Sequence, residues 1–355
     1  MKTARKTTYL SARAIDARLL AFIARGVEQR STDAEFGSLA LALFHHQFTQ
    51  NQPYRRYCES LGRSPRNVEH WKQIPAVPTT AFKDADLTTL PARQRTAVFH
   101  SSGTTKHRPS RHFHSAATLA LYEAALWPMF AQRMAKKGQL VILTPTPGEA
   151  PHSSLVHMME TVRRRIGAPR SASVGAAALE DGRVLAAAIR SAIRNPQSTL
   201  LLGTAFAFVR LLDSIKSLPL PSGSRVMETG GYKGRTREVP REELHALISA
   251  KLGVPRSGIV SEYGMCELSS QFYATSRSAV FTGPPWTRVQ VINPETGCEA
   301  REGERGLIRV FDLANRASVI AIQIEDVGTR RGDGFELIGR APQAEARGCS
   351  LMVTS

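Results

Sequence analysis

The chain carries a series of short apolar runs, each of which ends in a polar or glycine-rich turn. Four of these runs span residues 139–147, 198–206, 224–232 and 257–265. Short, almost wholly apolar runs are typical of parallel strands that are buried on both faces. Helical patterns separate the runs at intervals of about 10–15 residues. The alternation predicts an α/β domain whose parallel sheet has helices on both faces. The helices that we expect are 115–134, 153–165, 179–194, a helix that follows residue 206 and ends at about residue 214, and 241–252.

Two helical patterns precede this core. Near the N-terminus, we expect Leu19, Leu20, Phe22 and Ile23 to form the buried side of an amphipathic helix. Residues 33–60 repeat apolar side chains at helix-like intervals. This part of the chain is therefore expected to be a helical arm.

The composition and pattern of the sequence change towards the C-terminus. Residues 278–340 are rich in glycine, proline and short alternating runs, which predicts a mainly antiparallel β subdomain. We therefore divide the chain into a helical arm (1–72), an α/β core (73–277), a β subdomain (278–340) and a short tail (341–355).

The net charge of +17 comes from 47 Lys and Arg residues against 30 Asp and Glu residues. A spread excess of this kind favours acidic partners such as nucleic acid, an acidic carrier protein or ATP, and it equally fits a solvated basic surface. The sequence has no helix-turn-helix, zinc-finger or RNA-stacking signature, so no nucleic-acid partner is expected.

The four cysteines, Cys58, Cys266, Cys298 and Cys349, lie far apart and none is at CxxC spacing. A zinc site is therefore not expected, and the spacing suits free thiols in a reducing cytosol. No apolar run reaches about 18 residues, so no membrane span is expected. These features predict a cytoplasmic protein.

The first candidate motif is the loop Ser101, Ser102, Gly103, Thr104 and Thr105. It follows a predicted strand, and its hydroxyl and N–H groups suit the oxygens of a phosphate. Lys106, His107, Arg108 and Arg111 follow and add positive charge. An ordinary Ser/Thr loop is the alternative, and the GxxxxGK[ST] phosphate-loop pattern is absent.

Three further motifs each have a plain structural alternative. Gly230 and Gly231 end a predicted strand, where a glycine pair lets a flat ring lie against the backbone. In SEYGMCE, Tyr263 suits stacking on a base, and Glu267 supplies an oxygen that Mg²⁺ prefers. In EDVG, Asp326 follows an apolar run and precedes a glycine turn, which suits a carboxylate that accepts sugar hydroxyls. The alternatives are a simple turn, a core tyrosine with a surface acid, and an aspartate that closes a hairpin.

These turns are expected at the carboxyl ends of the strands, where open parallel sheets bind ligands, so we expect them to converge on one site. Taken in order, the motifs resemble those of the acyl-adenylate-forming (ANL) superfamily, and ELIGRA resembles its arginine hinge, with Arg340 as the arginine. The resemblance implies ATP and Mg²⁺ as cofactors and Glu267 as the metal ligand. The ATP-binding residues that it implies are Ser101, Ser102, Gly103, Thr104, Thr105, Gly230, Gly231, Tyr232, Tyr263, Gly264, Asp326 and Arg340.

Six segments resemble the LuxE-type acyl-protein synthetases of that superfamily more closely. They are IPAVPTTAFK, SSGTTKHRPSRH, PHSSLVHMM, METGGYKGRTRE, SEYGMCELSSQFY and GFELIGRAPQAEARGCSL. Two departures stand out: Lys106 replaces a glycine of the usual phosphate loop, and Cys266 replaces the usual YGxTE threonine. The C-terminal lid domain of the superfamily, with its catalytic lysine, is expected to be absent, because 15 residues follow Arg340.

An absent lid implies another acyl acceptor, and Cys349 in the short tail matches the cysteine that LuxE-type proteins acylate. The nearby Arg347 favours its thiolate form. An unreactive tail residue is the alternative. Arg340, Lys106 and Lys233 are the cations that we expect to stabilise charge in place of the lid lysine. His152, Ser153 and Ser154 are candidates for the acyl pocket, with helix capping and a solvated His152–His157 pair as the alternative.

The predicted function is ATP-dependent activation of a carboxylic acid, expected to be a fatty acid, to acyl-AMP. The acyl group is then transferred to Cys349 as a thioester for delivery to a partner, by analogy an acyl reductase. One alternative resembles the phenylacetate–coenzyme A ligases, with coenzyme A, a carrier protein or an amine as acceptor. A more distant alternative is a basic nucleic-acid-binding module on a degenerate adenylation fold. The sequence names neither the acyl group nor the oligomeric state.

Overall fold

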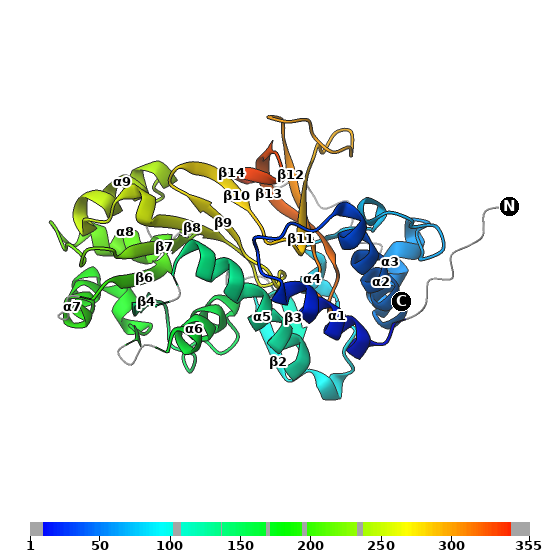
Figure 1. Ribbon diagram of the computed structural model, residues 1–355, viewed down its shortest axis with the longest axis horizontal. Helices are drawn as coiled ribbons and strands as arrows, with labels where there is room; N and C mark the ends of the chain where they lie inside the picture. The colour runs from blue at the N-terminus through cyan, green and yellow to red at the C-terminus, as the bar shows by residue number, and fades with distance from the viewer. Residues whose placement is uncertain are drawn as a thin grey trace. The chain divides into compact units, whose positions relative to one another are not determined.

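The computed structural model describes residues 10–101, 108–135, 137–167, 171–193, 197–232 and 237–341. The chain divides into two compact units, and each is treated by itself (Figure 1). The first unit comprises Met1–Leu126, Cys266–Ser270 and Gly283–Ser355, and the second comprises Trp127–Met265 and Gln271–Thr282. The division into arm, core, subdomain and tail that the sequence suggests stays a prediction. None of the helices in the described ranges is long and apolar enough to cross a membrane.

The second unit is built on a sheet in which the strand order is β10-β9-β8-β7-β6-β4-β5. Strands β4 to β8 pair in parallel, while β9 and β10 add antiparallel strands at one edge. The parallel strands β4, β6, β7 and β8 are those predicted from the apolar runs, whereas the short β5 was not predicted. The elements of this unit are β4 (Gln139–Leu143), α6 (Ser154–Ile166), β5 (Ala172–Ser173), η3 (Ala177–Glu180), α7 (Gly182–Ala192), β6 (Thr199–Thr204), α8 (Ala205–Asp213), β7 (Arg225–Thr229), α9 (Arg241–Leu252), η4 (Arg256–Gly258), β8 (Ile259–Tyr263), β9 (Phe272–Thr275) and β10 (Ser278–Thr282).

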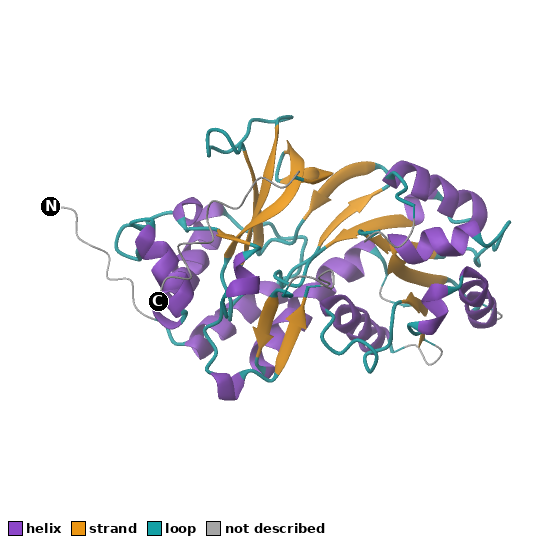
Figure 2. Cartoon of the chain, turned by 180° about the vertical axis from the view of Figure 1, so that it is seen from behind, coloured by secondary structure: helices purple, strands orange, loops and turns teal. Residues whose placement is uncertain are grey.

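Both faces of this sheet are covered, as the almost wholly apolar runs predict. One face packs against α7, α8 and α9, in a core that includes Val141, Leu201 and Val226 of the strands. Leu140 and Leu202 point to the other face and are equally buried. Figure 2 shows helices on both sides of the strands of this unit.

The first unit contains an antiparallel sheet of order β11-β12-β13-β14, and β1 pairs with β13 in parallel. This confirms the antiparallel character predicted for the C-terminal part of the chain. Helix α5 (Ala116–Arg133) begins in the first unit and ends in the second. The other elements are α1 (Ala12–Ala24), α2 (Asp33–Gln50), α3 (Gln52–Ser60), η1 (Trp71–Gln73), β1 (Val77–Pro78), α4 (Ala81–Asp84), η2 (Ala92–Gln94), β2 (Ala97–His100), β3 (Arg111–His114), β11 (Thr287–Ile292), β12 (Arg305–Asp312), β13 (Ala321–Arg331) and β14 (Gly334–Arg340).

Two details of the helical arm differ from the prediction. Leu20 is 40% exposed, because it falls outside the buried stripe that includes Leu19 and Ile23. The helical stretch 33–60 is two helices, which separate at Asn51. The backbone of Asn51 is extended and its side chain accepts a hydrogen bond from the Tyr54 N–H, so this residue caps α3.

Candidate active site

The candidate phosphate loop begins at Ser101, which is half-buried at the end of β2. The Ser101 hydroxyl accepts a hydrogen bond from the Ser110 N–H (2.9 Å), and the Ser101 N–H donates to the Ser110 carbonyl (3.2 Å). These two bonds close the base of the loop. Ser102, Gly103, Thr104, Thr105 and Lys106 lie outside the described residues, as does His107.

The expectation that this loop leaves a strand of the parallel sheet is wrong. Strand β2 pairs with β3 in a separate, two-stranded antiparallel sheet. Burial along β3 alternates from residue to residue, as in a strand with one solvated face. The loop is therefore the connection of a hairpin.

The charge of Arg111 is not freely available beside the loop. Its guanidinium group pairs with the Asp86 carboxylate at 2.8 Å, and Arg95 pairs with the same carboxylate at 2.8 Å. Asp86 therefore offsets part of the positive charge that the sequence suggested here.

Glu267, the candidate metal ligand, is buried in the first unit at 5% exposure. Its carbonyl oxygen accepts a hydrogen bond from Asn315 Nδ2 (3.0 Å). The carbonyl of the preceding Cys266 accepts from His112 Nδ1 (2.8 Å), and His112 lies on β3 beside the candidate phosphate loop. Burial lowers the pKa of His112 to about 4, so this imidazole is neutral near pH 7. The hydrogen bond thus connects the backbone of the YGMCE motif to the hairpin.

Glu267 offers a single carboxylate, which suits a Mg²⁺ ion that binds together with a nucleotide. Among the described residues, no group of three or more His, Cys, Asp or Glu side chains is placed to hold a metal ion. Mg²⁺ commonly uses one or two protein carboxylates together with substrate phosphates and water. A single carboxylate such as Glu267 therefore fits this mode, whereas a complete protein cage does not.

The sequence suggested that Asp326 comes just after its strand, either as a ligand or as the residue that closes a hairpin. In the structure it does neither. It lies inside β13, which continues to Arg331, and the turn to β14 contains Gly332 in a left-handed conformation (φ 54°). Across the ladder, Asp326 is the register partner of Arg340, the predicted hinge arginine. The Asp326 side chain is 18% exposed and that of Arg340 is 84% exposed. The carboxylate is thus partly sheltered, and the guanidinium group reaches solvent.

In the second unit, two of the predicted turns lie at the same edge of the sheet. Gly230 and Gly231 follow β7, and Tyr263 ends β8 and precedes Gly264. Strands β7 and β8 are neighbouring parallel strands, so their carboxyl ends lie side by side (Figure 1). All three glycines are exposed, and Gly231 has a positive φ of 105°, which a residue with a side chain rarely adopts.

The two candidate tyrosines are held in different ways. Tyr263 is 7% exposed, and its ring lies 5.8 Å from that of Phe281 and 6.4 Å from that of Phe272. The Tyr232 hydroxyl donates to the Val239 carbonyl (2.7 Å), and burial raises its pKa to about 12. Whether either ring contacts a nucleotide stays a prediction.

Buried polar groups also lie on β7, β8 and α9 close to these turns in the chain, and no role was predicted for them. Glu228 Oε1 lies 3.2 Å from His245 Nε2, and Arg241 Nε donates to the Ser261 hydroxyl (2.7 Å). Glu262, on β8, has a buried carboxyl group. Acidic residues inside otherwise apolar runs were the available signal, since strands buried on both faces seldom carry an acid without a specific partner.

The acyl-pocket candidates lie at the start of α6. The Ser153 hydroxyl caps this helix by accepting from the Val156 N–H (3.3 Å), which is the structural alternative considered for it. His152 is exposed and Ser154 is half-buried. Their role in acyl binding stays a prediction.

Three of the four predicted catalytic residues lie outside the described residues: Cys349, Lys233 and Lys106. The structure gives the surroundings of the other three cysteines. Cys58 and Cys266 are buried, and burial raises the pKa of both thiols. Cys298 is exposed on the first unit. The buried thiols are thus poorly suited to act as nucleophiles at neutral pH.

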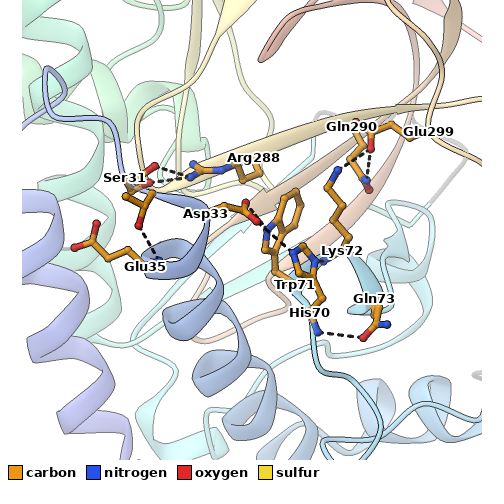
Figure 3. Close-up of polar contacts among 11 residues, drawn as sticks. Ser31, Asp33, Glu35, His70, Trp71, Lys72, Gln73, Arg288, Gln290 and Glu299 are labelled. Atoms are coloured by element: carbon orange, nitrogen blue, oxygen red, sulfur yellow. Dashed lines mark hydrogen bonds and ion pairs between the residues drawn. The ribbon is translucent and has the colours of Figure 1, made fainter.

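The first unit also contains a cleft of about 770 Å³ along α2. None of the predicted site residues lines it. At its wall, the Asp33 carboxylate accepts from Trp71 Nε1 (2.7 Å) and contacts His70 Nε2 (3.2 Å), and the neighbouring Lys72 pairs with Glu299 (Figure 3). The Asp33 contacts fasten the 70–73 turn to α2, so they are explained by the fold.

Comparison with known proteins gives one relative of established name and a clear structural class. The chain is 23% identical over 336 residues to the long-chain-fatty-acid–luciferin-component ligase of Aliivibrio fischeri, covering 88% of this chain and 86% of that protein. No protein-family model matches the sequence.

Solved structures establish the fold. A 2-hydroxyisobutyryl-CoA ligase in complex with 2-HIB-AMP, in its postadenylation state, superposes with a TM-score of 0.67 and 15% identity, covering 88% of this chain and 69% of that one. ATP-bound MatB from Rhodopseudomonas palustris gives a TM-score of 0.51 and 17% identity, covering 71% of this chain and 49% of that one. The chain therefore has the fold of the acyl-adenylate-forming enzymes and resembles a fatty-acid ligase along most of its length, as the motifs predicted.

Proposed function

We propose that this protein activates a carboxylic acid with ATP and then carries the acyl group on Cys349 as a thioester. The observation that carries the proposal is the 23% identity to a long-chain-fatty-acid ligase over 88% of this chain. The same chain has the fold of enzymes solved with an acyl-adenylate or with ATP. A long-chain fatty acid is accordingly the substrate class that we propose.

In the first step, a carboxylate oxygen of the acid attacks the α-phosphorus of ATP. The bond to the bridging oxygen breaks, and pyrophosphate leaves with that electron pair. The products are an acyl-adenylate and pyrophosphate. Because like charges meet in this step, catalysis depends on positioning and on neutralisation of phosphate charge.

Roles for the residues follow from the motifs. Ser101, Ser102, Gly103, Thr104 and Thr105 would hold phosphate oxygens. Ser101 is hydrogen-bonded to Ser110 at the base of the β2–β3 hairpin. Hydroxyl and N–H groups of a Ser/Thr/Gly loop suit an anion.

The motifs also suggest the other residues that would contact ATP. Gly230, Gly231 and Tyr263 would contact adenine, and Asp326 would accept the ribose hydroxyls. Tyr232 and Gly264 flank these turns. Glu267 would hold Mg²⁺, which would neutralise phosphate charge when bound. The cations proposed to act near the phosphates are Arg340, Lys106 and Lys233.

In the second step, the Cys349 thiolate attacks the carbonyl carbon of the acyl-adenylate. A thioester forms, and AMP leaves with the electron pair of the anhydride bond. Arg347, two residues away, would favour the thiolate. The thioester would then pass to a partner protein, which we propose to be an acyl reductase.

An acid-dependent exchange of labelled pyrophosphate into ATP tests the first step by itself. We expect exchange with at least one member of a panel of fatty, aryl and short-chain acids, and none without acid. An absence of exchange with the whole panel, from a protein with an intact melting transition, would overturn the proposed function.

A second candidate differs only in the acyl acceptor. The structural match to a coenzyme A ligase, which has also been solved with coenzyme A bound, favours coenzyme A as the alternative. In that case the Cys349→Ser variant would still release acyl-coenzyme A at the wild-type rate. Loss of the acylated protein in that variant, with exchange retained, would favour the cysteine instead.

A further inference from the structure

We propose that Glu262 is a positioning residue whose carboxyl group holds the glycine turn after β7 and the tyrosine–glycine turn after β8 in one fixed arrangement. The inference rests on the proposed function, in which these two turns contact the adenine of ATP. Glu262 itself would not touch the nucleotide. It would set the distance between the two backbone segments that do.

The first contact joins the two strands. Thr229 is the last residue of β7 and the register partner of Glu262 on β8. The Thr229 hydroxyl donates to Glu262 Oε2 at 2.5 Å, and both side chains are buried, at 7% and 4% exposure. A hydrogen bond to a carboxyl group shielded from water is stronger than one at the surface. Thr229 directly precedes Gly230, so this bond fixes the point at which the glycine turn begins.

The second contact concerns the turn after β8. A Cβ atom placed on Gly264 would lie 2.5 Å from Glu262 Oε1, which is closer than real Cβ atoms approach an oxygen. The absence of a side chain at Gly264 therefore leaves the space that the second carboxyl oxygen occupies. One oxygen of Glu262 thus contacts Thr229 before the first turn, and the other lies against Gly264 of the second turn.

The turns themselves have few means of holding their positions. A Cβ atom on Gly230 would meet nothing within 4 Å, and Gly231 has the positive φ already noted. Glycine brings no side chain to pack and loses more conformational freedom on ordering than any other residue. The geometry of the turns therefore depends on the residues next to them, and Glu262 contacts both sides.

The charged groups around Glu262 distinguish it from the acid on the neighbouring strand. Glu228 and Ser261 are register partners, one residue before Thr229 and Glu262, so their side chains point to the opposite face of the sheet. There they meet His245 and Arg241 of α9. Glu228 thus helps to fasten α9 to the sheet, whereas Glu262 faces the two turns.

The test measures the two turns separately in the full-length protein. In Glu262→Ala, a change on β8, we expect the Gly230 and Gly231 amides after β7 to exchange hydrogen about tenfold faster. In Thr229→Val, a change on β7 of nearly equal size, we expect the same for the Gly264 amide after β8. Thr229→Ser keeps the hydroxyl and should restore wild-type exchange. Thr199→Val is the matched control, because it is a buried threonine at the opposite, amino end of β6.

Kinetics then distinguish positioning from a general structural role. Thr229→Val should raise the KM for ATP by about tenfold and lower kcat much less, since it loosens nucleotide contacts made before the reaction. Thr229→Ser should return the KM to the wild-type value. A lower melting temperature with unchanged KM for ATP and unchanged exchange across the strands would overturn the proposal.

Hydrogen exchange is measured without catalysis. A failure of the proposed function can therefore be distinguished from a failure of the positioning role of Glu262. If the wild-type protein does not use ATP, the proposed function fails, and exchange still decides whether Glu262 couples the turns. If the wild-type protein uses ATP but each variant changes hydrogen exchange only on the strand that carries the substitution, the proposed function stands and the positioning role of Glu262 is refuted.

Discussion

Arg340 Nε lies 3.7 Å from Asp326 Oδ1, and the two residues are register partners on neighbouring antiparallel strands. Asp326 has the sequence context of a ribose-binding aspartate, and Arg340 that of a hinge arginine. The ladder between β13 and β14 therefore sets these two side chains next to each other. The pair lies largely in solvent on the arginine side, so its attraction contributes little to folding stability.

This arrangement predicts a change in activity without a change in stability. Asp326→Ala should raise the KM for ATP by about tenfold to a hundredfold, because hydrogen bonds to a charged group contribute about 1.5–3 kcal/mol each. The melting temperature should stay close to that of the wild type. Asp333→Ala is the control, because Asp333 is an exposed acid in the turn that follows β13. An equal effect of both substitutions on the KM would contradict a ribose role for Asp326.

Glu267 should control the response to magnesium. Glu267→Gln keeps the size of the side chain but removes the charge, and we expect pyrophosphate exchange to fall by about a hundredfold. The concentration of Mg²⁺ that gives half-maximal exchange should rise. Glu299→Gln serves as a control, because Glu299 is a partly buried acid of the same unit that pairs with Lys72. A Glu267→Gln enzyme with the wild-type Mg²⁺ response would exclude Glu267 as the ligand.

Glu262 should make stability depend on pH. Burial raises its pKa from 4.5 to about 7, the hydrogen bond from Thr229 opposes this shift, and the charge of Glu228 adds to it. The folded protein therefore holds this proton more tightly than the unfolded chain does. The stabilisation that this proton gives the folded protein is fully present below about pH 4.5 and is lost as the pH rises through about 7.

Glu262→Gln has no such proton to lose. Between about pH 5 and pH 8, its melting temperature should therefore fall by a few degrees less than that of the wild type. Glu228, His245 and Arg241 are present in both proteins, so the difference between the two curves reports on Glu262. Glu242→Gln, an exposed acid on α9, should follow the wild-type curve. Parallel curves for wild type and Glu262→Gln would show that Glu262 is already ionised at low pH in the folded state.

Local sequence patterns predicted the strands of the second unit well and the partners of other strands poorly. Residues 140–143 are Leu-Val-Ile-Leu and residues 200–203 are Leu-Leu-Leu-Gly, so burial on both faces was expected directly. The pattern of residues 97–100 indicated a strand, but it did not indicate that the partner would be β3 in a separate hairpin. The pattern of one strand does not specify which other strand it pairs with.

In the candidate site, too, local sequence patterns predicted some features and missed others. The motifs made Glu267 and Asp326 candidates, because an acid in a recognisable string of neighbours can be compared with a family. The residues that hydrogen-bond to the candidate site and its neighbours could not be identified from the motifs. Asn315 donates to the Glu267 carbonyl across 48 positions of the chain, and Thr229 reaches Glu262 across 33. Such long-range side-chain contacts leave no periodic signal in the sequence.

Intact-protein mass spectrometry shows whether Cys349 carries the acyl group. The full-length protein is incubated with ATP, Mg²⁺ and a panel of fatty acids, beside Cys349→Ser and the matched control Cys298→Ser, which removes the exposed cysteine of the first unit. If Cys349 is the acceptor, we expect a hydroxylamine-labile mass increase of one acyl group in the wild type and in Cys298→Ser, and none in Cys349→Ser. An adduct that persists in Cys349→Ser, or acid-dependent formation of AMP and pyrophosphate with no adduct in any of the three proteins, would contradict it.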